Sequence, residues 1–257
     1  MNFRFLRRWV TRTAALIGML GFIPNSADFI ANSVGIIADL GNICDRFQTP
    51  YICERFKRTA ETTPSQDAES YYNQGIMHSQ QGEYEQALAD YNKAIEIKPK
   101  YALAYYERGI VYRNQRKYEQ ALADYNKAID LKPEYALAYY ERGIVYRKQR
   151  KYEQALADYN KAIELKPKYA LAYYERGVVY YNQRKYKQAL ADYNKAIDLK
   201  PEEYPYFYYD RGMINRFYRN VEKAISDFEK AADLYKQQAN QKWYQNSLDR
   251  LKELRGN

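Results

Sequence analysis

The feature that most constrains how this chain can fold is a repeat of 34 residues. Residues 102–135 read ALAYYERGIVYRNQRKYEQALADYNKAIDLKPEY, and residues 136–169 repeat that string with three changes. Residues 68–101 and 170–203 are looser copies, and residues 205–238 are a degenerate fifth copy. A fixed period of this length predicts one structural unit that is stacked side by side along the chain.

Each copy predicts a pair of helices joined by a short turn. In the second copy, apolar and aromatic residues follow helical rather than alternating spacing in both halves. Residues 114–117 form the predicted turn, and Pro133 ends the second half because proline lacks the N–H group that a helix interior requires. The unit is therefore a helical hairpin, and the predicted fold class is all-α.

Small residues recur at the position where the two helices of each hairpin must cross. A glycine on the first helix and an alanine on the second reduce side-chain bulk there, so the helices can approach closely. The predicted packing residues are Gly75, Ala87, Gly109, Ala121, Gly143, Ala155, Gly177, Ala189, Gly212 and Ala224. A single hairpin cannot bury its apolar face, whereas stacked neighbours can.

This pattern resembles the tetratricopeptide repeat (TPR) family, in the bacterial form with near-identical tandem repeats. The family pattern is an aromatic residue, Gly, an aromatic residue, Ala, an aromatic residue, Ala and Pro. The second copy matches it at Tyr105, Gly109, Tyr112, Ala121, Tyr125, Ala128 and Pro133. The resemblance covers roughly two-thirds of the chain. It implies a right-handed superhelical solenoid of antiparallel helix hairpins. Proteins of this family usually bind peptides or proteins along the concave face.

The resemblance also implies which residues form the partner-binding groove, because first-helix residues line the concave face in this family. Carried over by position, these residues are Leu103, Tyr106, Glu107, Ile110, Arg113, Leu137, Tyr140, Glu141, Ile144, Arg147, Leu171, Tyr174, Glu175, Val178 and Tyr181. The row of Glu107, Glu141 and Glu175 favours a partner segment with apolar and basic side chains. Such a groove would repel a carboxylate, so the carboxylate tails that some family members bind are a poor match.

The adjacent tyrosines of each first helix need separate interpretations. Neighbouring residues on a helix point about 100° apart, so Tyr105 and Tyr106 cannot face the same core. We expect Tyr105, Tyr118 and Tyr125 to be core residues. We expect Tyr106 and its equivalents in the next two copies to be exposed in the groove, where tyrosine offers a large contact area at a small entropic cost.

Charged residues also recur with the period. An arginine beside each packing glycine and an aspartate in the second helix predict structural ion pairs. The predicted pairs are Arg108 with Asp124, Arg142 with Asp158, Arg176 with Asp192 and Arg211 with Asp227. The turn residue is Gly82 in the first copy but Arg116, Arg150 and Arg184 in the next three, where a positive φ would cost a little.

The composition argues against catalysis and against metal or cofactor binding. The chain has one histidine, His78, which is expected to be packed or half-buried, and two cysteines, Cys44 and Cys53, that form no Cys-x-x-Cys pair. The sequence contains no nucleotide-binding loop, nucleophile elbow or metal motif. We therefore predict no enzyme activity, no cofactor and no structural metal.

The C-terminal end departs from the repeat. Lys236 replaces the closing proline of the fifth copy, so the second helix of that copy is expected to run long. Residues 239–257 predict a capping helix that covers the last exposed apolar face of the solenoid. Its apolar side consists of Trp243, Tyr244, Leu248, Leu251 and Leu254.

Residues 1–67 do not repeat; they predict an N-terminal targeting or amphipathic helical segment followed by a linker, and two interpretations remain open. Four arginines precede an apolar stretch at residues 13–23, which is too short to span a bilayer but fits the apolar part of a secretory signal. Residues 28–43 can instead form an amphipathic helix that lies on a membrane or docks onto the first repeat. We expect an exported or membrane-associated protein that contacts the membrane through residues 1–43, with a cytoplasmic location as the alternative. Export would allow the two cysteines to pair.

The leading functional hypothesis is a non-catalytic scaffold that binds a segment of another protein on the concave face. One alternative is a membrane-attached or exported assembly factor that recruits partners through its repeats. Single-stranded nucleic-acid binding, by tyrosines that stack on bases, is the least favoured hypothesis. The sequence leaves open the identity of the partner, the oligomeric state and whether residues 1–33 are cleaved.

Overall fold

The computed structural model describes residues 64–256 of the chain. The chain divides into two units, Met1–Thr63 and Pro64–Asn257, and the described residues belong to the second. The predicted signal, amphipathic helix and cysteine pair therefore lie outside the described residues. Among residues 64–256, no helix is long and apolar enough to cross a membrane.

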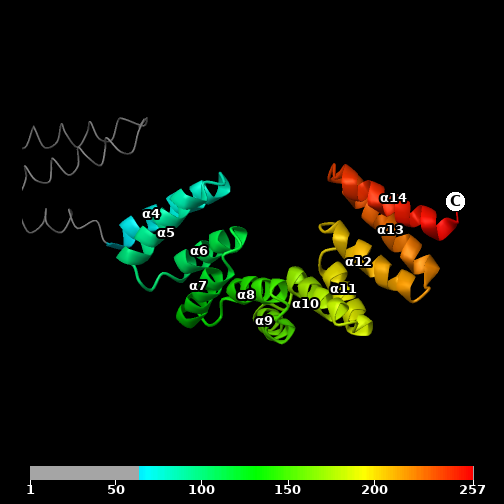
Figure 1. Cartoon of the computed structure of the whole chain (residues 1–257), viewed down its shortest axis with the longest axis horizontal. Coiled ribbons are helices and arrows are strands. Elements are labelled where there is room, and N and C mark those ends of the chain that lie inside the picture. The colour runs from blue at the N-terminus through cyan, green and yellow to red at the C-terminus, as the bar shows by residue number, and fades with distance from the viewer. Residues whose placement is uncertain (1–63, 257) are drawn as a thin grey trace, which may run out of the picture. The chain divides into compact units, whose positions relative to one another are not determined.

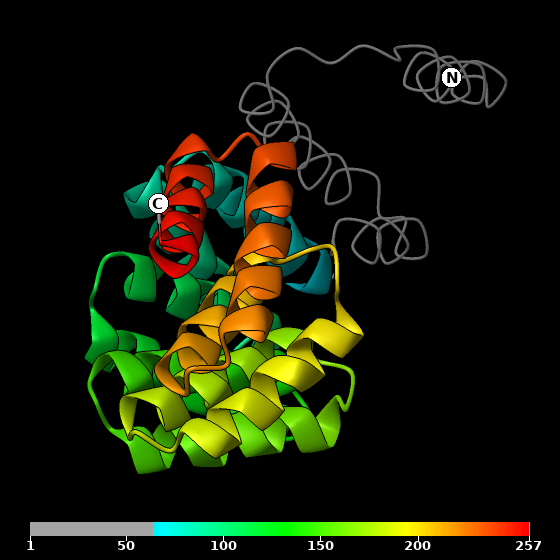
Figure 2. The ribbon, with the colours of Figure 1, turned by 90° about the vertical axis from the view of Figure 1, so that its right-hand side faces the viewer.

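The regular elements of the described residues are all α-helices. They are α4 (Pro64–Gln80), α5 (Tyr84–Ile97), α6 (Ala102–Asn114), α7 (Tyr118–Leu131), α8 (Ala136–Lys148), α9 (Tyr152–Leu165), α10 (Ala170–Asn182), α11 (Tyr186–Leu199), α12 (Pro205–Phe217), α13 (Val221–Gln237) and α14 (Gln241–Arg255). The first ten pair as hairpins, α4 with α5 through α12 with α13, and each hairpin packs against the next. Figure 1 shows α6 and α8 on the inner side of the resulting arc, with α7 and α9 on its outer side, and Figure 2 shows the stacked layers after a quarter turn. These residues form an all-α helical solenoid, which confirms the predicted fold class.

The close approach within each hairpin depends on the glycine at the crossing. A Cβ atom built at Gly109 would lie 2.6 Å from the ring of Tyr125, and one built at Gly143 would lie 2.7 Å from the ring of Tyr159. The contact is looser in the last hairpin, where the nearest atom to a Cβ at Gly212 would be 3.1 Å away. The alanines on the second helices are all fully buried: Ala87, Ala121, Ala155, Ala189 and Ala224.

Each turn within a hairpin contains one residue with positive φ. Gly82 has a φ of 77°, and Arg116, Arg150, Arg184 and Arg219 have φ values between 59° and 61°. The left-handed conformation brings the Cβ of an L-residue close to the following carbonyl oxygen, so it costs about 1 kcal/mol for a residue other than glycine. The four arginines therefore carry a conformational cost that Gly82 avoids.

The predicted arginine–aspartate ion pairs are confirmed in all four hairpins that carry them. Arg108 donates through Nε and Nη2 to Asp124 at 2.8 and 2.6 Å, and through Nη1 to Asn92 of the preceding hairpin at 2.6 Å. We call this three-helix link the arginine staple. Burial raises the pKa of Asp124, while the guanidinium group of Arg108 opposes that rise.

The first hairpin has a different link at this position. Gln74 replaces the staple arginine, and the half-buried ring of His78 contacts Asp90, with Nδ1 2.7 Å from Oδ2. His78 is therefore packed against the second helix, as the sequence predicts.

The second helix of the last hairpin runs long, as the sequence predicts, and one more helix follows it. α13 has 17 residues, whereas α7, α9 and α11 have 14 each. α14 packs on α13, with Leu251 buried in a cluster that includes Phe207 and Phe228. The rings of Trp243 and Tyr209 lie 5.2 Å apart, centroid to centroid. The final helix thus covers apolar surface of the last hairpin.

Candidate interaction groove

The predicted groove residues lie at three different depths. Leu103 and Tyr181 are exposed, each with 38% of its surface accessible. Tyr106, Tyr140 and Ile144 are buried. The remaining members are half-buried: Glu107, Ile110, Arg113, Leu137, Glu141, Arg147, Leu171, Tyr174, Glu175 and Val178.

The prediction that Tyr106 and its equivalents are exposed is wrong: Tyr106 and Tyr140 are each only 8% exposed, and Tyr174 is half-buried. The ring centroid of Tyr106 lies 6.2 Å from that of Tyr125 and 4.9 Å from that of Tyr135. Tyr135 directly precedes the next hairpin, so Tyr106 fills the interface between two hairpins. Tyr140 repeats this arrangement with Tyr169 at 4.9 Å.

The three tyrosines predicted as core residues also differ in burial. Tyr125 is fully buried, whereas Tyr105 and Tyr118 are half-buried. The ring of Tyr105 packs against the edge of the core and lies 5.4 Å from the guanidinium group of Arg108, so it also covers the arginine staple. Helical spacing gives the angle between adjacent tyrosines, but it does not say which of them faces the neighbouring hairpin.

Two ion pairs join the first helices of consecutive hairpins. Arg113 Nε lies 2.9 Å from Glu141 Oε2, and Arg147 Nε lies 2.7 Å from Glu175 Oε2. These atoms are close enough for ion pairing but are not aligned as hydrogen bonds. Burial raises the pKa of both glutamates, and the paired arginines oppose that rise. We call these residues, together with Glu107 and Asp210, the acid–arginine row.

The row has no arginine at its N-terminal end. Ser79 occupies the position that corresponds to Arg113, so Glu107 forms no ion pair among the described residues. Burial and the charge of Glu141 raise the pKa of Glu107 from 4.5 to about 6. Glu107 is therefore the member of the row whose charge is least compensated.

The row also ends without an arginine on the C-terminal side. Tyr181 stands in the arginine position before Asp210, and Asp210 accepts a hydrogen bond from the hydroxyl of Tyr174 at 2.6 Å. Burial raises the pKa of Asp210. Sequence reasoning missed Asp210 because the fifth copy is degenerate and starts one residue late. It also missed the row itself, although the 28-residue spacing of its arginine and glutamate partners recurs.

The face formed by the first helices thus presents carboxylates with aliphatic side chains between them. Among residues 64–256, no three His, Cys, Asp or Glu side chains are grouped as metal ligands would be. The arrangement can attract a cationic side chain and pack against an apolar one.

Comparison with known proteins agrees with the repeated hairpins. A family profile described as TPR repeat matches residues 75–115, 111–150 and 145–184, and one described as Tetratricopeptide repeat matches residues 170–203. Together they span residues 75–203, just over half of the chain. The chain belongs to the tetratricopeptide repeat family. Membership supports a role as a protein–protein interaction scaffold in general.

No curated protein matches this TPR chain, but many solved structures do. MamA from Desulfovibrio magneticus RS-1, residue 41 to the end, is 26% identical with a TM-score of 0.60, over 67% of this chain and 97% of that one. YrrB, described as a TPR protein with an unusual peptide-binding site, is 27% identical with a TM-score of 0.56, over 76% and 97%. PilF of Pseudomonas aeruginosa is 21% identical with a TM-score of 0.62, over 74% and 93%, and shows the fold alone.

Proposed function

We propose that this TPR protein is a non-catalytic scaffold that binds a segment of a partner protein on the face formed by its first helices. The acid–arginine row carries the proposal, because it sets four carboxylates against two guanidinium groups. The whole chain has a formal charge of +9, so this face is an acidic strip on a basic protein. Half-buried carboxylates in excess attract the lysine and arginine side chains of a partner.

The apolar members of the groove add a second requirement on the partner. Leu103 is exposed, and its equivalents Leu137 and Leu171 are half-buried on the next first helices. A partner segment that carries both basic and apolar side chains would bind the carboxylates and cover the leucines. The similarity to YrrB, which is described as having a peptide-binding site, supports a peptide as the ligand.

The test should avoid the groove tyrosines, because Tyr106 and Tyr140 pack between hairpins and their loss would disturb the fold. Peptides selected from a random library on the full chain are expected to be rich in lysine, arginine and apolar residues. The double variant Leu103→Ala, Glu107→Gln should bind them about tenfold more weakly, since it removes one apolar contact and one carboxylate.

The matched control is Asp130→Asn, which changes an exposed carboxylate on α7, outside the row. Its peptide affinity should equal that of the unchanged protein. Selection of acidic peptides, or equal affinity for the double variant with an unchanged circular dichroism spectrum, would refute the groove assignment.

A second candidate function is an assembly factor that residues 1–43 attach to a membrane or direct to export. Its support is the sequence pattern of four arginines before the apolar stretch at residues 13–23. Fractionation of the tagged full chain tests it. The variant Leu16→Asp, Leu20→Asp should move the protein from the membrane or exported fraction to the soluble cell fraction, and an unchanged distribution would exclude this role.

A further inference from the structure

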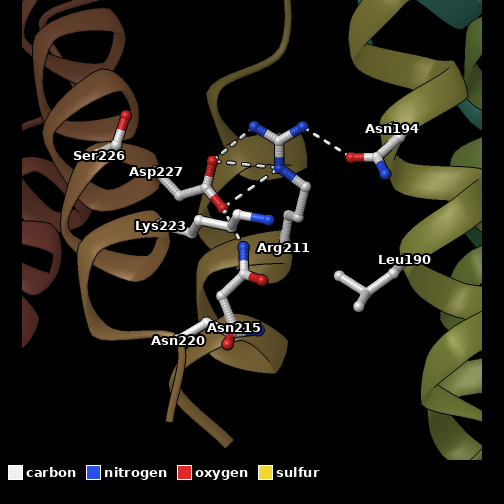
Figure 3. Close-up of a pocket in the computed structure, with 8 residues that line it drawn as sticks. All are labelled: Leu190, Asn194, Arg211, Asn215, Asn220, Lys223, Ser226 and Asp227. Atoms are coloured by element: carbon white, nitrogen blue, oxygen red, sulfur yellow. Dashed lines mark hydrogen bonds and ion pairs between the residues drawn. The ribbon is translucent and has the colours of Figure 1, made fainter. Parts of the chain in front are cut away.

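A polar cleft of about 400 Å³ lies between α11, α12 and α13 (Figure 3). Arg211 and Asn215 of α12 line it together with Leu190 and Asn194 of α11, and α13 supplies the opposite wall. The cleft is separate from the acid–arginine row, since none of its lining residues belongs to that row. Asn194, Asn220, Lys223 and Ser226 are exposed, so the cleft is open to solvent.

The cleft arises from substitutions that are confined to the fifth copy. Asn215 stands where the three preceding copies have Tyr112, Tyr146 and Tyr180. In the second hairpin that tyrosine ring lies 6.0 Å from the staple arginine, so the shorter asparagine leaves space beside Arg211. Three more lining positions differ from the fourth copy, where Lys185 becomes Asn220, Gln188 becomes Lys223 and Ala191 becomes Ser226. The lysine of the lining is therefore moved and not added.

The charged groups of the arginine staple in the cleft are already paired with each other. Arg211 donates to Asp227 through Nη2 at 2.6 Å and to Asn194 Oδ1 through Nη1 at 2.8 Å. Asn215 donates a further hydrogen bond to Asp227 at 2.8 Å. The charges of Arg211 and Asp227 therefore compensate each other, and the remaining charge of the lining is that of Lys223.

Lys223 has no ion-pair partner among the described residues, and Figure 3 shows its side chain extending from α13 into the cleft. Asn194 uses its Oδ1 as an acceptor, which leaves its Nδ2 group available as a second donor. Leu190 faces the same space and offers an apolar wall (Figure 3). These groups together suit a ligand with one negative charge, oxygen acceptors and a short apolar part.

We propose that this cleft binds a carboxylate group. A carboxylate carries one charge, which matches the single uncompensated cation, whereas a phosphate monoester approaches two charges and would leave the second one without a partner in the lining. The carboxylate can belong to a free small organic acid or to an acidic side chain of a peptide. The acidic groove on the first helices cannot be this site, because it would repel the same group.

The test is titration of the ¹⁵N-labelled full chain, followed through the side-chain amide signals of Asn194, Asn215 and Asn220 at constant ionic strength. Sodium propionate is the free acid probe, and the peptide acetyl-Ala-Glu-Ala-amide is the peptide probe, with its glutamine counterpart as the uncharged control. Saturable shifts are expected with the two carboxylates and not with the glutamine peptide. Tighter binding of the glutamate peptide assigns the site to proteins, and equal or tighter binding of propionate assigns it to free acids.

Two variants that restore residues of the preceding copies test the geometry. Lys223→Gln should weaken carboxylate binding about tenfold because it removes the charged donor. Asn215→Tyr should abolish binding by filling the cleft, and Tyr180→Asn, which opens the equivalent space beside Gln188, should create no new site. If Asn215→Tyr fails to fold, carboxylate binding by Lys223→Gln still tests the proposal. Absence of saturable shifts in the unchanged protein, or equal binding by Lys223→Gln, would overturn the proposal.

Discussion

The crossing glycine is packed more tightly in the middle hairpins than in the last hairpin. In residues 102–203 every crossing glycine contacts a tyrosine ring closely enough to exclude a Cβ atom, and a tyrosine stands four residues after each staple arginine, at Tyr112, Tyr146 and Tyr180. In residues 205–238 the glycine contact loosens, and an asparagine replaces that tyrosine. Near-identical copies present near-identical surfaces, so the terminal copies are where this TPR protein can acquire a distinct binding site.

The outer edge of the turns shows the same contrast. Gln115 donates to Glu85 of the preceding hairpin at 3.0 Å, and the next two copies repeat this link. In the last hairpin Tyr218 takes the glutamine position and Lys187 takes the glutamate position, so the link is lost. Phe217 and Tyr218 are exposed there, at 63% and 41%. A regular array thus ends in a unit whose surface differs in charge and shape.

Removal of the staple arginine should give the largest difference in stability between a middle hairpin and the last hairpin. Arg142→Ala would leave Asp158, 4% exposed, without its counter-charge, and we expect the free energy of unfolding to fall by about 3 kcal/mol. Arg211→Ala should cost less, about 2 kcal/mol, because Asn215 still donates to Asp227. Urea unfolding followed by circular dichroism measures both variants, and equal losses would contradict the difference between the two regions.

Substitution of the crossing glycine should also lower the free energy of unfolding more in a middle hairpin than in the last hairpin, but by a smaller amount than loss of the staple arginine does. In Gly143→Ala the new methyl group would meet the buried ring of Tyr159 at 2.7 Å, and we expect a loss of about 2 kcal/mol. Gly212→Ala meets its nearest atom at 3.1 Å and gains helix propensity, so its loss should be below about 1 kcal/mol. Thermal and urea unfolding report both, and a larger loss at Gly212 would reverse the interpretation of the looser last hairpin.

The unpaired Glu107 should make stability depend on pH. Its pKa is about 6 in the folded chain and 4.5 ordinarily, so the folded state binds the proton more tightly and this contribution to stability is lost as pH rises from 4.5 through 6. Glu107→Gln should flatten that part of the profile and stabilise the protein by about 1 kcal/mol at pH 7.5, after allowance for solvent screening. Asp130→Asn is the exposed control, and a profile that Glu107→Gln leaves unchanged would count against the assignment.

Substitution of the turn arginines should change the free energy of unfolding least, and by the same amount in the middle hairpins and in the last hairpin. Arg150→Gly and Arg219→Gly each replace a residue with φ near 60° by one that adopts it freely, as Gly82 does in the first hairpin. We expect each to raise the free energy of unfolding by about 0.7 kcal/mol, because strain is relieved and part of the gain is lost to the greater flexibility of the unfolded chain. A loss of stability at either site would mean that the arginine side chain makes a contact of greater value than the strain.

The sequence by itself determined the features that depend on spacing along one chain. The 34-residue period, the glycine and alanine positions and the proline ends predict helical hairpins, and the recurring Arg108 and Asp124 predict the staple. These predictions hold because each relies on residues within one hairpin, where helix geometry, the short turn and the close crossing of the two helices together fix their relative positions.

Only the tertiary structure decided which side chains face the neighbouring hairpin. Tyr106 is buried and Tyr105 is half-buried because Tyr135 of the adjoining hairpin packs on the former, and spacing within one helix contains no information about that neighbour. The Arg113–Glu141 pair and the cleft beside Asn215 have the same origin, since both form between hairpins. The period shows that units stack, whereas the rotation of one unit against the next decides what each surface displays.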